Sequence, residues 1–102
     1  MTKIDIRPQD LDILRHVLKA RLPHRVRVYV FGSRATGRAR RASDLDLAID
    51  AGRPLTLEER AGLAEAFSDS DLPYKVDVAD MHGVDAAFRA VVERERVPLL
   101  LI

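Results

Sequence analysis

Three aspartates lie in segments whose apolar and polar residues alternate, as is typical of β-strands. Asp44 and Asp46 fall within residues 44–50, and Asp77 falls within residues 74–79. Successive side chains of a strand point to opposite faces, so the apolar residues between the aspartates face the core and the aspartates face away from it, with Asp44 and Asp46 roughly 6–7 Å apart. If the two strands are neighbours, all three carboxylates share one sheet face. Their mutual repulsion then opposes ionisation, and a divalent cation removes that conflict.

The chemistry of these side chains indicates which ion they would hold. Carboxylate oxygens, with no histidine or cysteine among them, favour magnesium or manganese over zinc. An Asp-x-Asp pair on a strand is also compatible with a plain solvated strand face. Aspartate is nevertheless depleted in strands, and a third one on another strand favours a metal site.

A Gly-Ser pair, Gly32 and Ser33, directly follows an alternating segment at residues 26–31. Glycine after a strand lets the backbone approach a ligand closely, and amides at a helix start offer hydrogen-bond donors to a phosphate, to which the Ser33 hydroxyl adds one more. The pair alone is a weak indication, because many loops begin this way. The specific feature is the order strand, Gly-Ser, ten residues, then Asp-x-Asp on a strand.

The composition narrows the class of protein. The chain of 102 residues is long enough for one domain, 1–102, and it has no cysteine, which excludes disulfides and thiolate metal sites. No signal peptide or membrane-length apolar run is evident, so we expect a soluble cytoplasmic protein with no membrane partner. Residues 13–43 contain no acidic side chain, but the net charge is only +1, which argues against direct nucleic-acid binding. The arginine-rich stretch is compatible with a solvated surface.

The elements expected around these motifs alternate between helix and strand. Apolar periodicity, together with a Thr56–Glu59 capping box, predicts helices at 8–22, from Thr56 onward and at about 84–95, and strands at 26–31, 44–50 and 74–79. Residues 34–43 are expected to form a polar turn or short helix, and the apolar tail 99–102 should pack on the domain or on a partner. This order predicts an α+β fold, a small mixed β-sheet with helices packed on one face.

The motifs resemble those of the MNT-type minimal nucleotidyltransferases of the DNA polymerase β superfamily. The resemblance lies in residues 32–37 (Gly-Ser-Arg-Ala-Thr-Gly) and 43–49 (Ser-Asp-Leu-Asp-Leu-Ala-Ile), with Asp77 where the family places its third carboxylate. It extends from about Val26 to the end of the chain. The tail departs from it, because many relatives end in a glycine-containing turn and a tyrosine.

The resemblance implies a role for each motif residue. Asp44, Asp46 and Asp77 would be the catalytic residues and would hold two Mg²⁺ ions, with Mn²⁺ as an alternative. Gly32 and Ser33 would hold the β- and γ-phosphates of ATP or another NTP, and Arg34 would neutralise charge nearby. Lys75, Arg38, Arg40 and Arg41 are further candidates for phosphate contact, with an ion pair or a partner contact as the alternative.

The resemblance also implies a partner. Short members of the family occur with HEPN toxins as antitoxins and are thought to transfer AMP from ATP to a tyrosine of the toxin, which makes protein adenylyltransferase the expected activity. Two alternatives stay open: a binding module that neutralises a HEPN ribonuclease by contact alone, and transfer to a small-molecule acceptor. A homo-oligomer is also compatible with the sequence.

Overall fold

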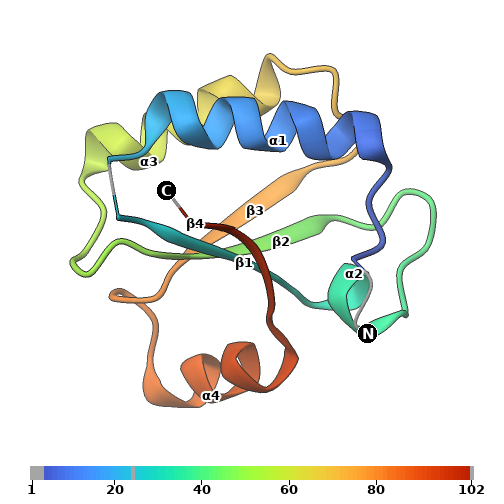
Figure 1. Cartoon of the computed structure of the whole chain (residues 1–102). Helices are drawn as coiled ribbons and strands as arrows, with labels where there is room; N and C mark the ends of the chain where they lie inside the picture. The colour runs from blue at the N-terminus through green and yellow to red at the C-terminus, as the bar shows by residue number, and fades with distance from the viewer. Residues whose placement is uncertain (1–3, 24, 102) are drawn as a thin grey trace.

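The computed structural model describes residues 4–23 and 25–101, which form four helices and four strands (Figure 1). In chain order these elements are α1 (Pro8–Arg21), β1 (Arg27–Phe31), α2 (Ser33–Thr36), β2 (Leu45–Asp50), α3 (Leu57–Ser68), β3 (Val76–Asp80), α4 (Ala86–Glu95) and β4 (Val97–Leu101). The expected helices and strands are all present, with ends shifted by a few residues. Within the described ranges, no helix is long and apolar enough to cross a membrane.

The four strands form one mixed sheet in the order β3-β2-β1-β4. β1 is antiparallel to both of its neighbours, and β2 is parallel to β3. Parallel neighbours need a crossover connection, which α3 supplies. The predicted mixed sheet is therefore confirmed, and β2 and β3, which carry the aspartates, are neighbours.

The apolar tail adds the fourth strand. Its backbone pairs with β1, and Pro98 stands opposite Tyr29 at a register shift between Val28 and Tyr29. Proline is tolerated because β4 is an edge strand, where a missing N–H need not break a ladder. The tail backbone thus pairs within its own domain as far as Leu101; Ile102 lies outside the described residues.

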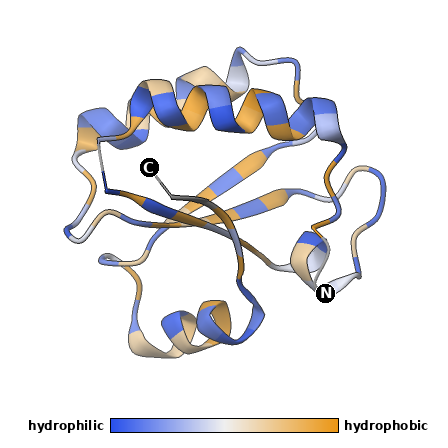
Figure 2. Ribbon diagram, in the orientation of Figure 1, coloured by the Kyte–Doolittle hydropathy of each residue, from blue (hydrophilic) through white to orange (hydrophobic). Residues whose placement is uncertain are grey.

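Two helices, α1 and α3, cover one face of the sheet (Figure 1). The core between them contains fully buried leucines, isoleucine and valines from both layers, among them Leu14, Leu18, Leu47, Ile49 and Leu63. Figure 2 shows the alternation of hydrophobic and hydrophilic residues along the strands that produces this face. The capping box that starts α3 is present as predicted, with the Thr56 hydroxyl accepting a hydrogen bond from the Glu59 amide and the Glu59 carboxylate accepting one from the Thr56 amide.

The remaining long helix, α4, lies on the opposite face, which corrects the expectation that all helices share one face (Figure 1). The reason is a small second cluster on that face, where Phe31 and Ala48 bury against Met81 and Val92. Apolar side chains at these two strand positions give α4 a surface to cover. The helix therefore ends beside the aspartates, with Glu95 as its last residue.

Candidate active site

Asp46 and Asp77 stand side by side on the two parallel strands. Their Cα atoms are register partners between β2 and β3. The neighbouring Leu45 and Leu47 are fully buried on the α1/α3 side, so alternation turns both aspartates to the other face. Asp44 directly precedes β2 and is exposed. The expectation that strand pairing brings Asp46 and Asp77 together is confirmed.

The surroundings of Asp46 disfavour its charged form. Burial raises the pKa of the Asp46 carboxyl above its ordinary value, and neighbouring negative charges raise it further. Those charges belong, in decreasing order of effect, to Asp77, Asp44 and Glu95. A cation at this position would relieve both the desolvation and the repulsion.

The carboxylates lie near one another without converging on a point. Across residues 4–23 and 25–101, no group of three histidine, aspartate or glutamate side chains is placed to hold one ion. Repulsion between like charges favours this separation. Asp44 is exposed and the Asp77 side chain is 44% exposed, so both have room to turn toward Asp46. The set of carboxylate oxygens fits magnesium or manganese chemistry.

Lys75 immediately precedes β3, and its side chain lies beside Asp77. Its Nζ is 3.3 Å from Asp77 Oδ1, which makes the ion pair that the sequence left open as an alternative to phosphate contact. Both side chains are exposed, so the pair contributes little to stability and leaves Asp77 accessible.

Gly32 lies directly against Asp46. It has φ 75° and ψ −155°, a conformation that residues with a side chain avoid. A Cβ atom at this position would overlap the Asp46 carboxylate. The register explains the closeness, because Phe31, the residue before Gly32, is the Cα partner of Asp46. Tertiary structure thus joins the Gly-Ser turn to the Asp-x-Asp strand, and only glycine fits at the junction.

Ser33 begins a single helical turn, α2. The Gly32 carbonyl accepts hydrogen bonds from the amides of Ala35 and Thr36, each at 3.1 Å, and another from the Thr36 hydroxyl. Gly37, at φ 80° and ψ 14°, ends the turn in the left-handed conformation. The result is a tight turn whose half-buried Ser33 stands one residue from the glycine that contacts Asp46.

Glu95, at the end of α4, completes the surroundings and was missed by sequence reasoning. The Gly32 amide donates to Glu95 Oε1 at 3.2 Å, and Arg38 lies 3.4 Å from Glu95 Oε2. The two residues of the first contact are 63 positions apart. In the sequence Glu95 is one of several charged residues at a helix end, and nothing in its spacing distinguishes it from a solvated charge.

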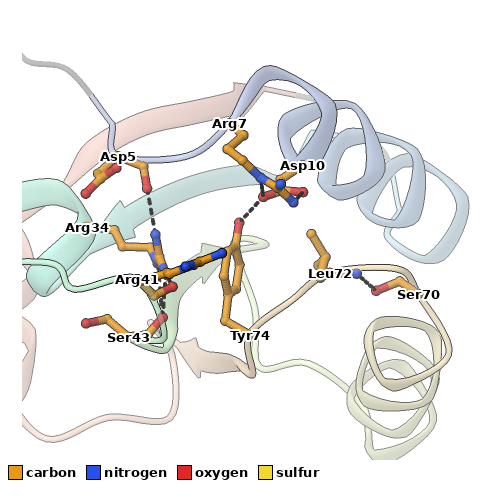
Figure 3. Close-up of polar contacts among 9 residues, drawn as sticks. All are labelled: Asp5, Arg7, Asp10, Arg34, Arg41, Ser43, Ser70, Leu72 and Tyr74. Carbon is orange, nitrogen blue, oxygen red and sulfur yellow. Dashed lines mark hydrogen bonds and ion pairs between the residues drawn. The ribbon is translucent and has the colours of Figure 1, made fainter.

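Arg34, expected to neutralise charge near the nucleotide, directs its guanidinium to backbone carbonyl oxygens (Figure 3). Its side chain is buried and donates to the carbonyl oxygens of Ser43 (2.7 and 3.1 Å), Asp5 (3.0 Å) and Arg41 (3.3 Å). The guanidinium also stacks on Tyr74, 4.1 Å from the ring centroid. Arg34 thus uses its donors to fix the loop that leads into Asp44.

A buried acid lies behind this loop. Asp10, only 1% exposed, accepts two hydrogen bonds of 3.0 Å from Arg7 and one of 3.2 Å from the Tyr74 hydroxyl (Figure 3). The hydrogen bond from Arg7 is the main reason that the pKa of Asp10 lies below its ordinary value, while burial raises the pKa of Tyr74 to about 12. This network connects α1 to the segment before β3 and is structural.

The site thus lies on a mixed four-stranded sheet, with aspartates on adjacent strands beside a Gly-Ser turn. The family described as polymerase beta, nucleotidyltransferase matches residues 10–100. The chain therefore belongs to this family, and it is a nucleotidyltransferase.

Within this family, the chain is similar to a named protein and to solved structures. A protein of Haemophilus influenzae (strain ATCC 51907 / DSM 11121 / KW20 / Rd), named "Probable protein adenylyltransferase MntA", is 40% identical over 92 residues, which are 90% of this chain and 80% of that protein. A crystal structure of a toxin–antitoxin with AMP-PNP is 26% identical, with a TM-score of 0.76, covering 89% of this chain and 73% of that one. The crystal structure of the toxin–antitoxin MntA-HepT shares the fold, with a TM-score of 0.69 and 22% identity over 92% and 72% of the two chains.

Proposed function

We propose that this protein is a magnesium-dependent adenylyltransferase that moves AMP from ATP onto a hydroxyl of a protein partner. The partner we propose is a HEPN-type toxin with a tyrosine as the acceptor, so that the chain acts as the antitoxin. What carries the proposal is the contact of Gly32 with Asp46, with Asp77 in register on the next strand. The likeness to MntA and to a toxin–antitoxin with AMP-PNP supports it. Location in the cytoplasm stays a prediction.

Each motif residue has a part in this proposal. Asp44, Asp46 and Asp77 would hold two magnesium ions, and manganese could replace magnesium. When bound, magnesium supplies positive charge that offsets the triphosphate and the leaving pyrophosphate. The Gly32 backbone and the Ser33 hydroxyl hold the β- and γ-phosphates.

The reaction is an in-line displacement. The acceptor oxygen forms a bond to the α-phosphorus while the bond from that phosphorus to the bridging oxygen breaks, and pyrophosphate leaves. The proton of the acceptor hydroxyl passes to Asp77 and then to solvent. Most of the rate enhancement comes from positioning and from charge stabilisation.

The test is AMP transfer in a defined mixture. The purified chain is incubated with ATP, magnesium and the HEPN-type toxin proposed as its partner, and the toxin is weighed by intact mass spectrometry. We expect a gain of one AMP per modified hydroxyl, abolished by Asp46→Asn. Asp71→Asn, a matched change at an exposed loop aspartate, should leave transfer intact. A complex that silences the toxin without any mass gain would instead identify a module that neutralises by contact.

A further inference from the structure

Glu95 places a carboxylate at the turn where the proposed phosphates would bind. It is the last residue of α4, and its side chain reaches across to accept the Gly32 amide hydrogen at 3.2 Å. Carboxylate and phosphate oxygens are the same class of hydrogen-bond acceptor for a backbone N–H. Glu95 therefore uses a donor that a phosphate oxygen would also use.

Arg38 connects Glu95 to the other side of the same turn. Its Nη2 lies 3.4 Å from Glu95 Oε2, and its Nε donates to the Thr36 hydroxyl at 3.1 Å. That hydroxyl in turn donates to the Gly32 carbonyl at 3.1 Å. Arg38 therefore links the two groups that hold the Gly32 backbone: Glu95, which accepts from the Gly32 amide, and the Thr36 hydroxyl, which donates to the Gly32 carbonyl.

The two partners differ in how firmly they are held. The Arg38 side chain is 70% exposed and the Glu95 side chain 20% exposed, so the ion pair between them is a weak, solvated one. Glu95 also adds negative charge beside Asp46, at a site that must admit a polyanion. Arg34 cannot supply the compensating cation, because its donors are bonded to loop carbonyls. Arg38 contacts Thr36 and Glu95 at this turn, and because its side chain is exposed it can exchange Glu95 for a phosphate.

We propose that Glu95 closes the phosphate turn until nucleotide arrives, and that a triphosphate oxygen replaces it at the Gly32 amide and takes over Arg38 as its counter-ion. This exchange rests on the proposed function, because it assumes that the Gly32–Ser33 turn holds phosphates. It makes Arg38 a nucleotide-binding residue and Glu95 a competitor for the same turn. It also couples nucleotide binding to the end of α4.

Binding of a non-hydrolysable ATP analogue tests the exchange, measured by calorimetry at saturating magnesium. Glu95→Gln keeps a weaker, neutral acceptor for the Gly32 amide, so the fold should persist and the Kd should fall by about threefold to tenfold, the range expected for a charge contact at a partly exposed site. Arg38→Ala should raise the Kd by a similar factor. Glu93→Gln on the same helix and Arg15→Ala on α1, both at exposed positions, should change it less than about twofold.

The Gly32 amide resonance provides a readout that does not depend on activity. It should shift in Glu95→Gln and shift again when the analogue binds to the unmodified protein. If Glu95→Gln weakens binding as much as Arg38→Ala does, Glu95 holds the turn in a binding-competent form and the exchange is refuted. If the unmodified protein does not bind the analogue at all, the proposed function fails and the exchange fails with it. Binding by the unmodified protein with no change in either variant refutes the exchange alone.

Discussion

The contact between Gly32 and Asp46 can be tested by stability measurements alone. Gly32→Ala places a Cβ onto the Asp46 carboxylate and forces alanine into a conformation that glycine alone adopts readily. The backbone strain costs about 1–3 kcal/mol. Displacing the carboxylate from its packed position adds about 1–3 kcal/mol. We expect Gly32→Ala to lower the free energy of unfolding by about 2–6 kcal/mol, a large part of the stability of a small domain.

A double-mutant cycle separates the two contributions. In an Asp46→Ala background the carboxylate is gone, and the Cβ at position 32 would meet the Cβ at position 46 at 3.5 Å, an ordinary contact. Gly32→Ala should then cost only the backbone strain, which gives a coupling energy of about 1–3 kcal/mol. Gly52→Ala serves as a control, since Gly52 has φ 74° but nothing within 4 Å of an added Cβ.

The assay is urea unfolding followed by circular dichroism, with the free energies extrapolated to water. Coupling between Gly32→Ala and Asp46→Ala should be clear, and coupling between Gly52→Ala and Asp46→Ala should be absent. Additivity of the first pair within about 0.5 kcal/mol would refute the close approach of turn and strand from which the active site is built.

Three further predictions concern the loop that Arg34 holds, the loss of stability at low pH, and the binding of magnesium. Arg34→Lys should lower the free energy of unfolding by about 2–4 kcal/mol, because lysine cannot donate to several carbonyls from one buried fork. Urea unfolding measures the change, and an unchanged free energy would show that Arg34 does not hold the loop. Hydrogen bonding, chiefly from Arg53, lowers the pKa of Glu59 from 4.5 to about 2. The ionised Glu59 carboxylate therefore stabilises the fold above pH 4.5, and this stabilisation is lost as the pH falls toward 2. Glu59→Gln should reduce the dependence of the free energy of unfolding on pH between these values, and an unchanged dependence would contradict the assignment. Magnesium at a hundredfold excess over its Kd should add about 2.7 kcal/mol of stability, an effect that Asp46→Asn should abolish in thermal unfolding; equal stabilisation of both proteins would place the metal elsewhere.

Patterns between residues close in the chain were sufficient to predict the motifs and most of the helices and strands. The two-residue period of strands put Leu45 and Leu47 into the core and Asp46 onto the opposite face, and the structure has this arrangement. The Thr56–Glu59 capping box needed only residues three apart. These features were predictable because the forces behind them act between near neighbours in the chain.

The face chosen by α4 was not predictable from its own periodicity. An amphipathic helix specifies which side is buried but not what it is buried against. Phe31 and Ala48, on two other elements, provide that surface. The pairing of the tail with β1 is similar, since its apolar composition was compatible with packing on the domain or on a partner.

The sequence by itself indicated a metal site through the type and spacing of the strand aspartates, and it indicated nucleotidyl transfer through the resemblance of Gly32, Ser33 and these aspartates to a known family. Only the tertiary structure decided how the charged residues around them are used. Arg34 stands next to Ser33 in the chain but turns to the loop carbonyls, whereas Glu95, 63 residues from Gly32, reaches its amide. The physical reason is that a charged side chain satisfies its hydrogen bonds wherever folding places suitable partners, and those partners lie on distant segments that no local pattern records.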